Sequence, residues 1–245
     1  MSAIASLPCS MAAMGELRRI GLLGGMSWES TELYHRLVNE AVRERLGGFH
    51  SARLVLASVD FAEVEAMQAA GEWDRAGDLL AAEARGLEAA GAACVVLCTN
   101  TMHKVAGAIE EAVGIPLLHI GDVTARAVRE AGVERVALLG TRFTMEQDFL
   151  RERLASDGLD VVVPDAAGRT VVHDVIYGEL VHGVVRDASR AAYVEVVERL
   201  VAAGAQGVVL GCTEIELLVG PDDVDVPVFA TTALHARAAV DFALS

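Results

Sequence analysis

Lysine is almost absent from the sequence, and this absence narrows the chemistry available to the protein. Of its 20 basic residues, only Lys104 is a lysine. Enzymes that form a Schiff base, including those that use pyridoxal phosphate, need a lysine amine. A pyridoxal enzyme would therefore have one candidate, Lys104, which directly follows the motif CTNTMH.

Basic residues, Lys and Arg together, are few. The 20 Lys and Arg residues face 35 Asp and Glu residues, which gives a formal net charge of −15. Such a surface repels phosphate, so the composition argues against a nucleic-acid partner. No apolar run approaches the roughly 18 residues of a membrane span, which argues against a membrane partner. An acidic substrate would need a local pocket of hydrogen-bond donors.

Cysteines are few and lack the spacings of metal sites. The four are Cys9, Cys94, Cys98 and Cys212, without a C-x-x-C pair or zinc-finger spacing. We expect no metal, reduced thiols and a cytoplasmic protein. The glycine turn GLLGGM also lacks the spacing of a dinucleotide fingerprint, and there is no P-loop motif. Residues 1–16, small and apolar, are expected to form a tail.

Alternating strands and helices are what the chain does contain. Apolar runs at 17–25, 52–61, 93–98 and 115–120 predict strands, separated by segments with helical periodicity. The helix after the first glycine turn should be capped by Ser27 or Ser30 and should end at Gly47–Gly48. The sequence predicts an α/β fold with parallel sheet.

The second half repeats the elements of the first. Runs at 134–141, 159–164, 206–212 and 226–231 repeat the four expected strands. We expect two similar lobes related by a pseudo-twofold axis, each a four-stranded parallel sheet flanked by helices. The first lobe would comprise residues 17–120 and 231–245, and the second residues 121–230. Ligands of such sheets bind beyond the carboxyl ends of the strands, so we expect the site in the cleft between the lobes.

Two copies of one segment align without a gap. AGAACVVLCTNT starts at Ala90 and AGAQGVVLGCTE starts at Ala203, an offset of 113 positions. Cys212 therefore corresponds to Thr99, and Cys98 corresponds to Gly211. The alignment makes Cys98 the last residue of its strand and predicts that Thr99 faces the substrate.

Cys212 stands where a buried strand gives way to an expected helix, TEIELL. The amides and dipole of a helix N-terminus lower the pKa of a thiol, and Thr213 could cap that helix. Such a cysteine suits a base or a nucleophile. The glycine turn GGMS and the strand end TNT offer amides and small polar side chains that can hold a carboxylate.

The motifs GLLGGMSWEST, CTNTMHKV and GCTEIELL resemble those of the aspartate/glutamate racemase family, in the same order and over nearly the whole chain from about Leu17. The resemblance implies a two-lobed α/β enzyme, a homodimer without a cofactor, that moves a proton from one face of an amino acid's α-carbon to the other. Most members have two cysteines, the first in a CNT motif. Thr99 here replaces that first cysteine, as in a subgroup specific for L-aspartate and L-glutamate.

By this resemblance, Cys212 is the base that acts on the L enantiomer, and Thr99 relays or donates a proton on the other face. Because a hydroxyl is a poor base, conversion from L to D should exceed the reverse. The same motifs imply a set of substrate-binding residues: Met26, Ser27, Asn100, Thr101, Thr213 and Glu214.

Several readings remain open beside this one. A single thiol could reprotonate a decarboxylated malonate or add to maleate for cis–trans isomerisation, and a non-catalytic ligand-binding protein could use the same scaffold. His103 could bind substrate or only pack. In aspartate-specific members a lysine precedes a glycine near the segment VIYGELVHG, where this sequence has His182, so the contact to a substrate side chain is open too.

Overall fold

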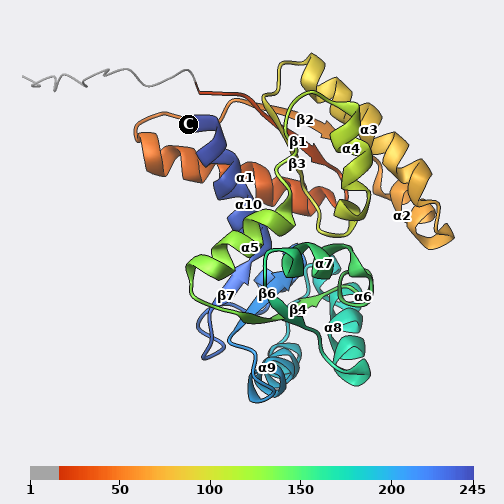
Figure 1. Ribbon diagram of the computed structural model, residues 1–245, viewed down its shortest axis with the longest axis vertical. Coiled ribbons are helices and arrows are strands. Elements are labelled where there is room, and N and C mark those ends of the chain that lie inside the picture. The colour runs from red at the N-terminus through yellow and green to blue at the C-terminus, as the bar shows by residue number, and fades with distance from the viewer. Residues whose placement is uncertain (1–16) are drawn as a thin grey trace, which may run out of the picture.

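The computed structural model describes residues 17–245; the expected tail at 1–16, with Cys9, lies outside the described residues. Two lobes lie one above the other, each built on a parallel sheet with helices on both faces (Figure 1). This confirms the predicted fold class. Among residues 17–245, no helix combines the length and apolarity that crossing a membrane requires.

The first lobe carries the sheet β2-β1-β3. Its described elements are β1 (Ile20–Gly24), α1 (Trp28–Leu46), β2 (Leu54–Ser58), α2 (Phe61–Ala70), α3 (Trp73–Ala89), β3 (Cys94–Leu97), the 3-10 helix η1 (Thr101–Val105) and α4 (Ala106–Ala112).

The second lobe carries the sheet β5-β4-β6-β7. Its elements, with the last helix, are α5 (Ile120–Glu130), β4 (Arg135–Gly140), α6 (Arg142–Glu146), α7 (Asp148–Ser156), β5 (Asp160–Val162), α8 (Ala166–Gly178), η2 (Leu180–His182), α9 (Asp187–Ala202), β6 (Gly207–Gly211), η3 (Thr213–Leu217), β7 (Val228–Ala230) and α10 (Thr231–Leu244).

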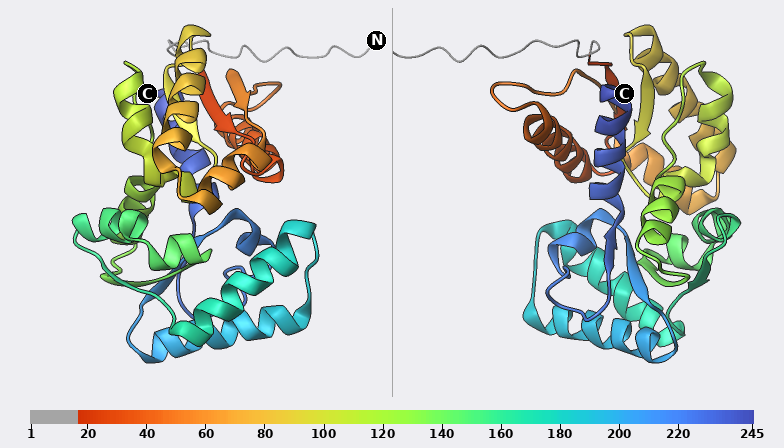
Figure 2. Two further views of the ribbon diagram at one scale, coloured as in Figure 1. Left: turned by 90° about the vertical axis from the view of Figure 1, so that its right-hand side faces the viewer. Right: turned by 60° about the vertical axis from the view of Figure 1, so that its left-hand side comes forward.

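Helix α10 joins the two lobes. It starts at the end of β7 and runs into the first lobe, where it packs along α1 (Figure 2). Tyr34 of α1 is fully buried there, and its hydroxyl bonds to Nδ1 of His235 at 2.9 Å. The C-terminal helix therefore completes the core of the first lobe, although it follows the last strand of the second.

The internal repeat extends to the pairing of the strands. In the first lobe Ile20 of β1 lies beside Cys94 of β3, and in the second Val136 of β4 lies beside the equivalent Gly207 of β6. The amide of Cys98 then donates to the carbonyl of Leu23 at 2.8 Å, which continues the ladder by one residue. Because the two registers match, the two strand ends reach the same height in their sheets.

The first sheet differs from the four strands expected of it. Residues 115–120 form only a bridge, in which Leu117 pairs with Val95. His119 already caps α5 by accepting from the amide of Gly121 at 3.0 Å, so only Leu117 and Leu118 lie between Pro116 and the cap. Too few residues remain for a strand. The bridge nevertheless occupies the place of β7, since Val208, the equivalent of Val95, pairs with Val228.

Candidate active site

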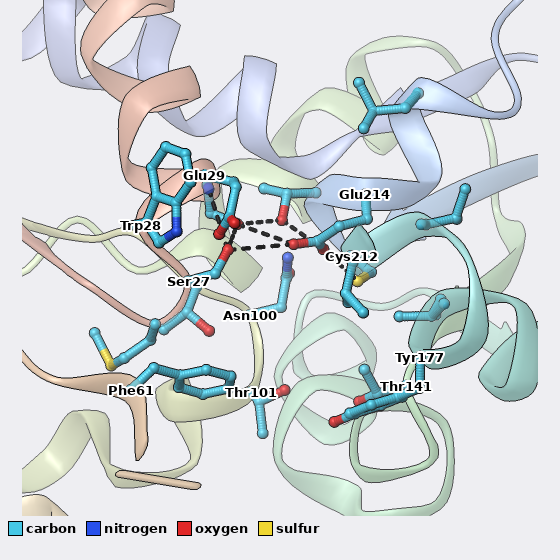
Figure 3. A pocket seen from close by; sticks show the side chains of 18 of the residues that line it. Ser27, Trp28, Glu29, Phe61, Asn100, Thr101, Thr141, Tyr177, Cys212 and Glu214 are labelled. Atoms are coloured by element: carbon cyan, nitrogen blue, oxygen red, sulfur yellow. Dashed lines mark hydrogen bonds between the residues drawn. The ribbon is translucent and has the colours of Figure 1, made fainter. Parts of the chain in front are cut away.

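A pocket of about 630 Å³ lies between the lobes at the carboxyl ends of their strands (Figure 3). Both lobes contribute to its walls. The residues predicted from the sequence all line it: Met26, Ser27, Thr99, Asn100, Thr101, Cys212, Thr213 and Glu214. The fold thus brings the three sequence motifs to one place, while the role of each residue stays a prediction.

The first wall begins at the glycine turn after β1. Gly25 has a φ of +93°, and a Cβ there would lie 2.2 Å from the carbonyl oxygen of Val59, so only glycine fits. The Gly25 amide donates to the hydroxyl of Thr31 at 2.8 Å. This tight turn directs Met26 and Ser27 into the pocket.

Ser27 caps α1, as the sequence predicts. Its Oγ accepts from the amide of Ser30 at 3.3 Å. The two serine hydroxyls also reach across to the other lobe, where Oε1 of Glu214 lies 3.5 Å from Ser27 Oγ and 3.3 Å from Ser30 Oγ (Figure 3). The cap of one lobe therefore contacts the acid of the other.

Cys212 lies at the centre of the opposite wall. Its thiol donates to Oε2 of Glu214 at 2.9 Å. Burial, followed by the negative charge of Glu214, raises the pKa of the Cys212 thiol well above its ordinary value. The expected lowering of this pKa by a helix N-terminus is therefore wrong. The segment after Cys212 is a 3-10 helix of only five residues, and it turns a carboxylate toward the sulfur.

Thr213 does not cap that helix, contrary to expectation. No side-chain cap is formed; its Oγ1 donates to Oε2 of Glu214 at 2.8 Å and lies 2.5 Å from Ser30 Oγ. Glu214 thus receives hydrogen bonds from a thiol and three hydroxyls. It links the serines of the first lobe to the thiol of the second.

The first lobe places its own sulfur elsewhere. Cys98 is completely buried against Tyr34 and Ala236, does not line the pocket, and has its pKa raised by burial. Thr99, the next residue, lines the pocket instead. The chain bends at Cys98, where the amide of Thr99 donates to the carbonyl of Leu97 at 2.8 Å. This places one side chain in the core and the next at the pocket, while the catalytic role of Thr99 stays a prediction.

His103 holds Thr99 from behind. It is buried and does not line the pocket; its Nδ1 bonds to the carbonyl of Thr99 at 2.7 Å, and its Nε2 accepts from the amide of Ile120 at 3.2 Å. Burial lowers the pKa of His103 well below its ordinary value, which keeps the ring neutral. Of the two roles left open for it, the structure supports packing.

Asn100 and Thr101 complete this end of the pocket. Asn100 Nδ2 donates to the hydroxyl of Thr231 at 3.1 Å, and that hydroxyl donates to the carbonyl of Leu210 at 2.8 Å. Oδ1 of Asn100 is buried without a partner among residues 17–245. These two hydrogen bonds, from Asn100 through Thr231 to Leu210, fix the strand end of the first lobe against the second sheet.

An apolar wall was not predicted from the sequence. Phe61 starts α2, while Ile176, Tyr177, Leu180 and Val181 come from the end of α8 and the turn that follows it. Four of these residues lie in the segment VIYGELVHG, where only His182 was a candidate from the sequence, and helical periodicity marks α8 only as a packing helix. His182, beside them, also lines the pocket.

Other chemistries find little support at this site. Lys104 does not line the pocket; its Nζ lies 3.8 Å from the centre of the Trp73 ring and 2.7 Å from Oε1 of Gln147. Within residues 17–245, no three His, Cys, Asp or Glu side chains gather as metal ligands. The lining groups with acid–base chemistry include the Cys212–Glu214 pair, the hydroxyls around it and His182.

Comparison with known proteins gives a family and two close structures. Residues 23–239 match the Asp/Glu/hydantoin racemase family. A candidate Asp/Glu racemase from Yersinia pestis is 52% identical, with a TM-score of 0.89 over 93% of this chain and 100% of the other. An aspartate racemase homologue from Pyrococcus horikoshii is 32% identical, with a TM-score of 0.84 over 93% and 100%.

A more distant structure shares the fold. Aspartate racemase from Picrophilus torridus is 20% identical, with a TM-score of 0.74 over 92% of this chain and 94% of the other. The two-lobed architecture is therefore common to chains whose sequences have diverged widely.

Proposed function

The chain belongs to the Asp/Glu/hydantoin racemase family, and we propose that it racemises an amino acid at the α-carbon, with Cys212 and Thr99 acting on opposite faces. One observation carries the proposal: the equivalent strand ends of the two lobes meet at a single pocket, with a thiol on one and a hydroxyl on the other. Racemisation needs two proton-transfer groups with this relation to one carbon.

The proton path starts at the Cys212–Glu214 pair. Glu214 accepts the thiol proton, and the thiolate then removes the α-proton of the L-amino acid. The ammonium group of the substrate offsets the negative charge that this transfer leaves in the pocket. The resting thiol thus becomes a base only when substrate is bound, which is consistent with the raised pKa of Cys212 in the free protein.

Thr99 serves the other face. After the α-proton has moved to sulfur, the negative charge lies on the α-carbon and the substrate carboxylate, where hydroxyl and amide donors stabilise it. Thr99 relays a proton from water to the free face, which completes the D-amino acid. Glu214 returns its proton to the solvent, so the protein regains its starting state without a cofactor. The reaction as proposed leaves no net change in protons or electrons.

Deuterium exchange in D₂O tests this function. L-aspartate and L-glutamate are the reference substrates, since related proteins carry their names, and L-methionine and L-glutamine widen the set. We expect Cys212→Ser to reduce α-proton exchange by at least about 10³-fold, because a serine hydroxyl is a far weaker base. Cys98→Ala, the matched control, should keep exchange within a few fold. Absence of exchange with every amino acid would overturn the proposal.

A further inference from the structure

The lining of the pocket carries almost no positive charge. None of the described residues that line the pocket is Arg or Lys, whereas two of them, Glu29 and Glu214, are acids. His182 is the one side chain of the lining that can become a cation. Residues 1–16 contain neither Arg nor Lys. The charged residues that line the pocket are therefore acidic, as is the protein as a whole with its net charge of −15.

Two basic residues lie near the pocket without lining it. Lys104 is held by the Trp73 ring and by Gln147. Arg36 lines a smaller adjoining pocket of about 210 Å³, together with Glu29 and Glu32. The two acids of that smaller pocket lie beside this guanidinium.

Polar donors in the pocket are also partly used. The hydroxyls of Ser27, Ser30 and Thr213 and the thiol of Cys212 all contact Glu214. The strand end at 99–101, the indole and phenol groups of the lining and the backbone amides around the pocket remain for a ligand, and all of these donors are uncharged. These suffice for one carboxylate, the α-carboxylate that every amino acid carries.

Apolar side chains supply the rest of the surface. Nine large apolar side chains of residues 17–245 are exposed, and five of the nine line this pocket: Trp28, Phe61, Tyr177, Val181 and Leu217. Exposed apolar surface gathered at a pocket is typical of a ligand-binding wall. A ligand that covers it gains the free energy of removing apolar surface from water.

A second carboxylate would bind poorly against such a wall. It would lose water without gaining a cation, and it would approach Glu29 and Glu214. We propose that this enzyme prefers amino acids with uncharged, largely apolar side chains of about the size of methionine or leucine over aspartate and glutamate. The inference rests on the proposed racemase function and names the substrate class of the same pocket.

Exchange kinetics in D₂O with matched substrates test it. L-glutamate, L-glutamine and L-methionine have side chains of similar length, and only the first is an anion. We expect kcat/KM for L-methionine to exceed that for L-glutamate by about tenfold or more at low salt, with L-glutamine between them. Added salt should narrow the gap, because it screens the repulsion.

The outcomes separate the two proposals. A value for L-glutamate equal to or above that for L-methionine would overturn the preference and leave the racemase function intact. A lack of exchange with all of these amino acids would instead sink the proposed function itself.

A charge placed on the wall gives a second test. Val181 is 37% exposed and lines the pocket, so a longer side chain fits there without disturbing the core. Val181→Lys should raise the ratio of kcat/KM for L-glutamate over L-methionine by at least threefold, whereas Val181→Met, unbranched and nearly as long but uncharged, should not. An unchanged ratio in the lysine variant would count against the inference.

His182 is tested separately because it is the one side chain of the lining that can become a cation. His182→Gln should lower kcat/KM for L-glutamate and L-methionine by similar factors. A selective loss of tenfold or more for L-glutamate would mean that this imidazole already binds a side-chain carboxylate, and the proposed preference would then be wrong.

Discussion

The two strand ends at the pocket differ in where each lobe places its sulfur. In the first lobe the strand ends Cys98-Thr99, and the thiol is buried in the core while the hydroxyl lines the pocket. In the second lobe it ends Gly211-Cys212, and the thiol lines the pocket while no side chain fills the core position. One repeated backbone thus carries two chemically unequal groups to one pocket.

The surroundings of the two groups differ as well. Behind Thr99, the neutral ring of His103 binds the backbone carbonyl and leaves the hydroxyl unengaged by it. Beside Cys212, the carboxylate of Glu214 binds the reactive atom itself. The first lobe fixes the position of its group, whereas the second also controls its protonation. A repeat can therefore conserve geometry while its halves specialise.

Removing the hydroxyl should separate proton exchange from inversion. In Thr99→Ala, Cys212 can still remove the α-proton from the L-amino acid and return a deuteron to the same face. We expect formation of the D enantiomer to fall by about 10²-fold or more, while deuterium still enters the L substrate. Chiral chromatography combined with mass spectrometry measures both. Equal losses of exchange and inversion would contradict the assignment of one group to each face.

Restoring a thiol in the first lobe should make the lobes more alike. Thr99→Cys should speed conversion from D to L relative to conversion from L to D, because a thiol is a better base than a hydroxyl. Initial rates from each pure enantiomer at saturating concentration test this; kcat/KM must be equal in the two directions because the enantiomers have equal free energies. If the ratio of the two initial rates does not change, the comparison of the two strand ends does not describe catalysis.

Neutralising Glu214 should release the thiol of the second lobe. The charge of Glu214 and its hydrogen bond both raise the pKa of Cys212, so Glu214→Gln should lower that pKa. The pH profile of alkylation by iodoacetamide should shift to lower pH, while racemisation slows by about 10–100-fold because the proton acceptor is lost. Glu29→Gln serves as a control, since no contact joins Glu29 to the sulfur. An unshifted profile in Glu214→Gln would remove Glu214 from the mechanism.

The core of the first lobe accommodates the side chain of Cys98, but the core of the second lobe should not accommodate a side chain at the equivalent Gly211. A Cβ on Gly211 would lie 2.9 Å from the carbonyl oxygen of Leu139 and 3.0 Å from Cγ2 of Thr144. Gly211→Ala should lower the free energy of unfolding by about 1–3 kcal/mol, as measured by urea denaturation. Gly86→Ala is the control: its Cβ would meet nothing within 4 Å and should be neutral or stabilising. Equal effects would mean that the two core positions are interchangeable.

The acid beneath Cys212 should make stability depend on pH. Burial raises the pKa of Glu216 from 4.5 to about 7, so the folded state binds this proton more tightly than the unfolded state. The contribution of this protonated carboxyl to the free energy of unfolding is present below about pH 4.5 and is lost as pH rises toward 7. Glu216→Gln should therefore stabilise the protein at pH 8 by about 1–2 kcal/mol and have little effect near pH 4.5.

Thermal unfolding of Glu216→Gln at the two pH values checks this, beside Glu198→Gln on an exposed face of α9. A stabilisation of the same size at both pH values would show that burial of the charge is not its cause.

The sequence predicted the strand ends well because their signal is local. Long apolar runs that stop at glycine, threonine or cysteine mark both where a buried strand ends and which residues follow it. The pKa of Cys212 was predicted with the wrong sign for the opposite reason. Proximity along the chain placed Glu214 two residues away, but only the tight turn of η3 directs its carboxylate to the sulfur.

The repeat, read from the sequence alone, determined which residue of each strand end faces the pocket. Two identical spacings impose one register on two sheets, and a strand has only two faces, so the choice between Cys98 and Thr99 followed. Tertiary structure decided the character of the pocket. Its apolar wall and its lack of Arg and Lys arise from α1, α2 and α8, and the burial of Cys212 arises from the core to which α8 and α9 contribute. These helices are separate in the chain, and their periodicity specifies only that they pack.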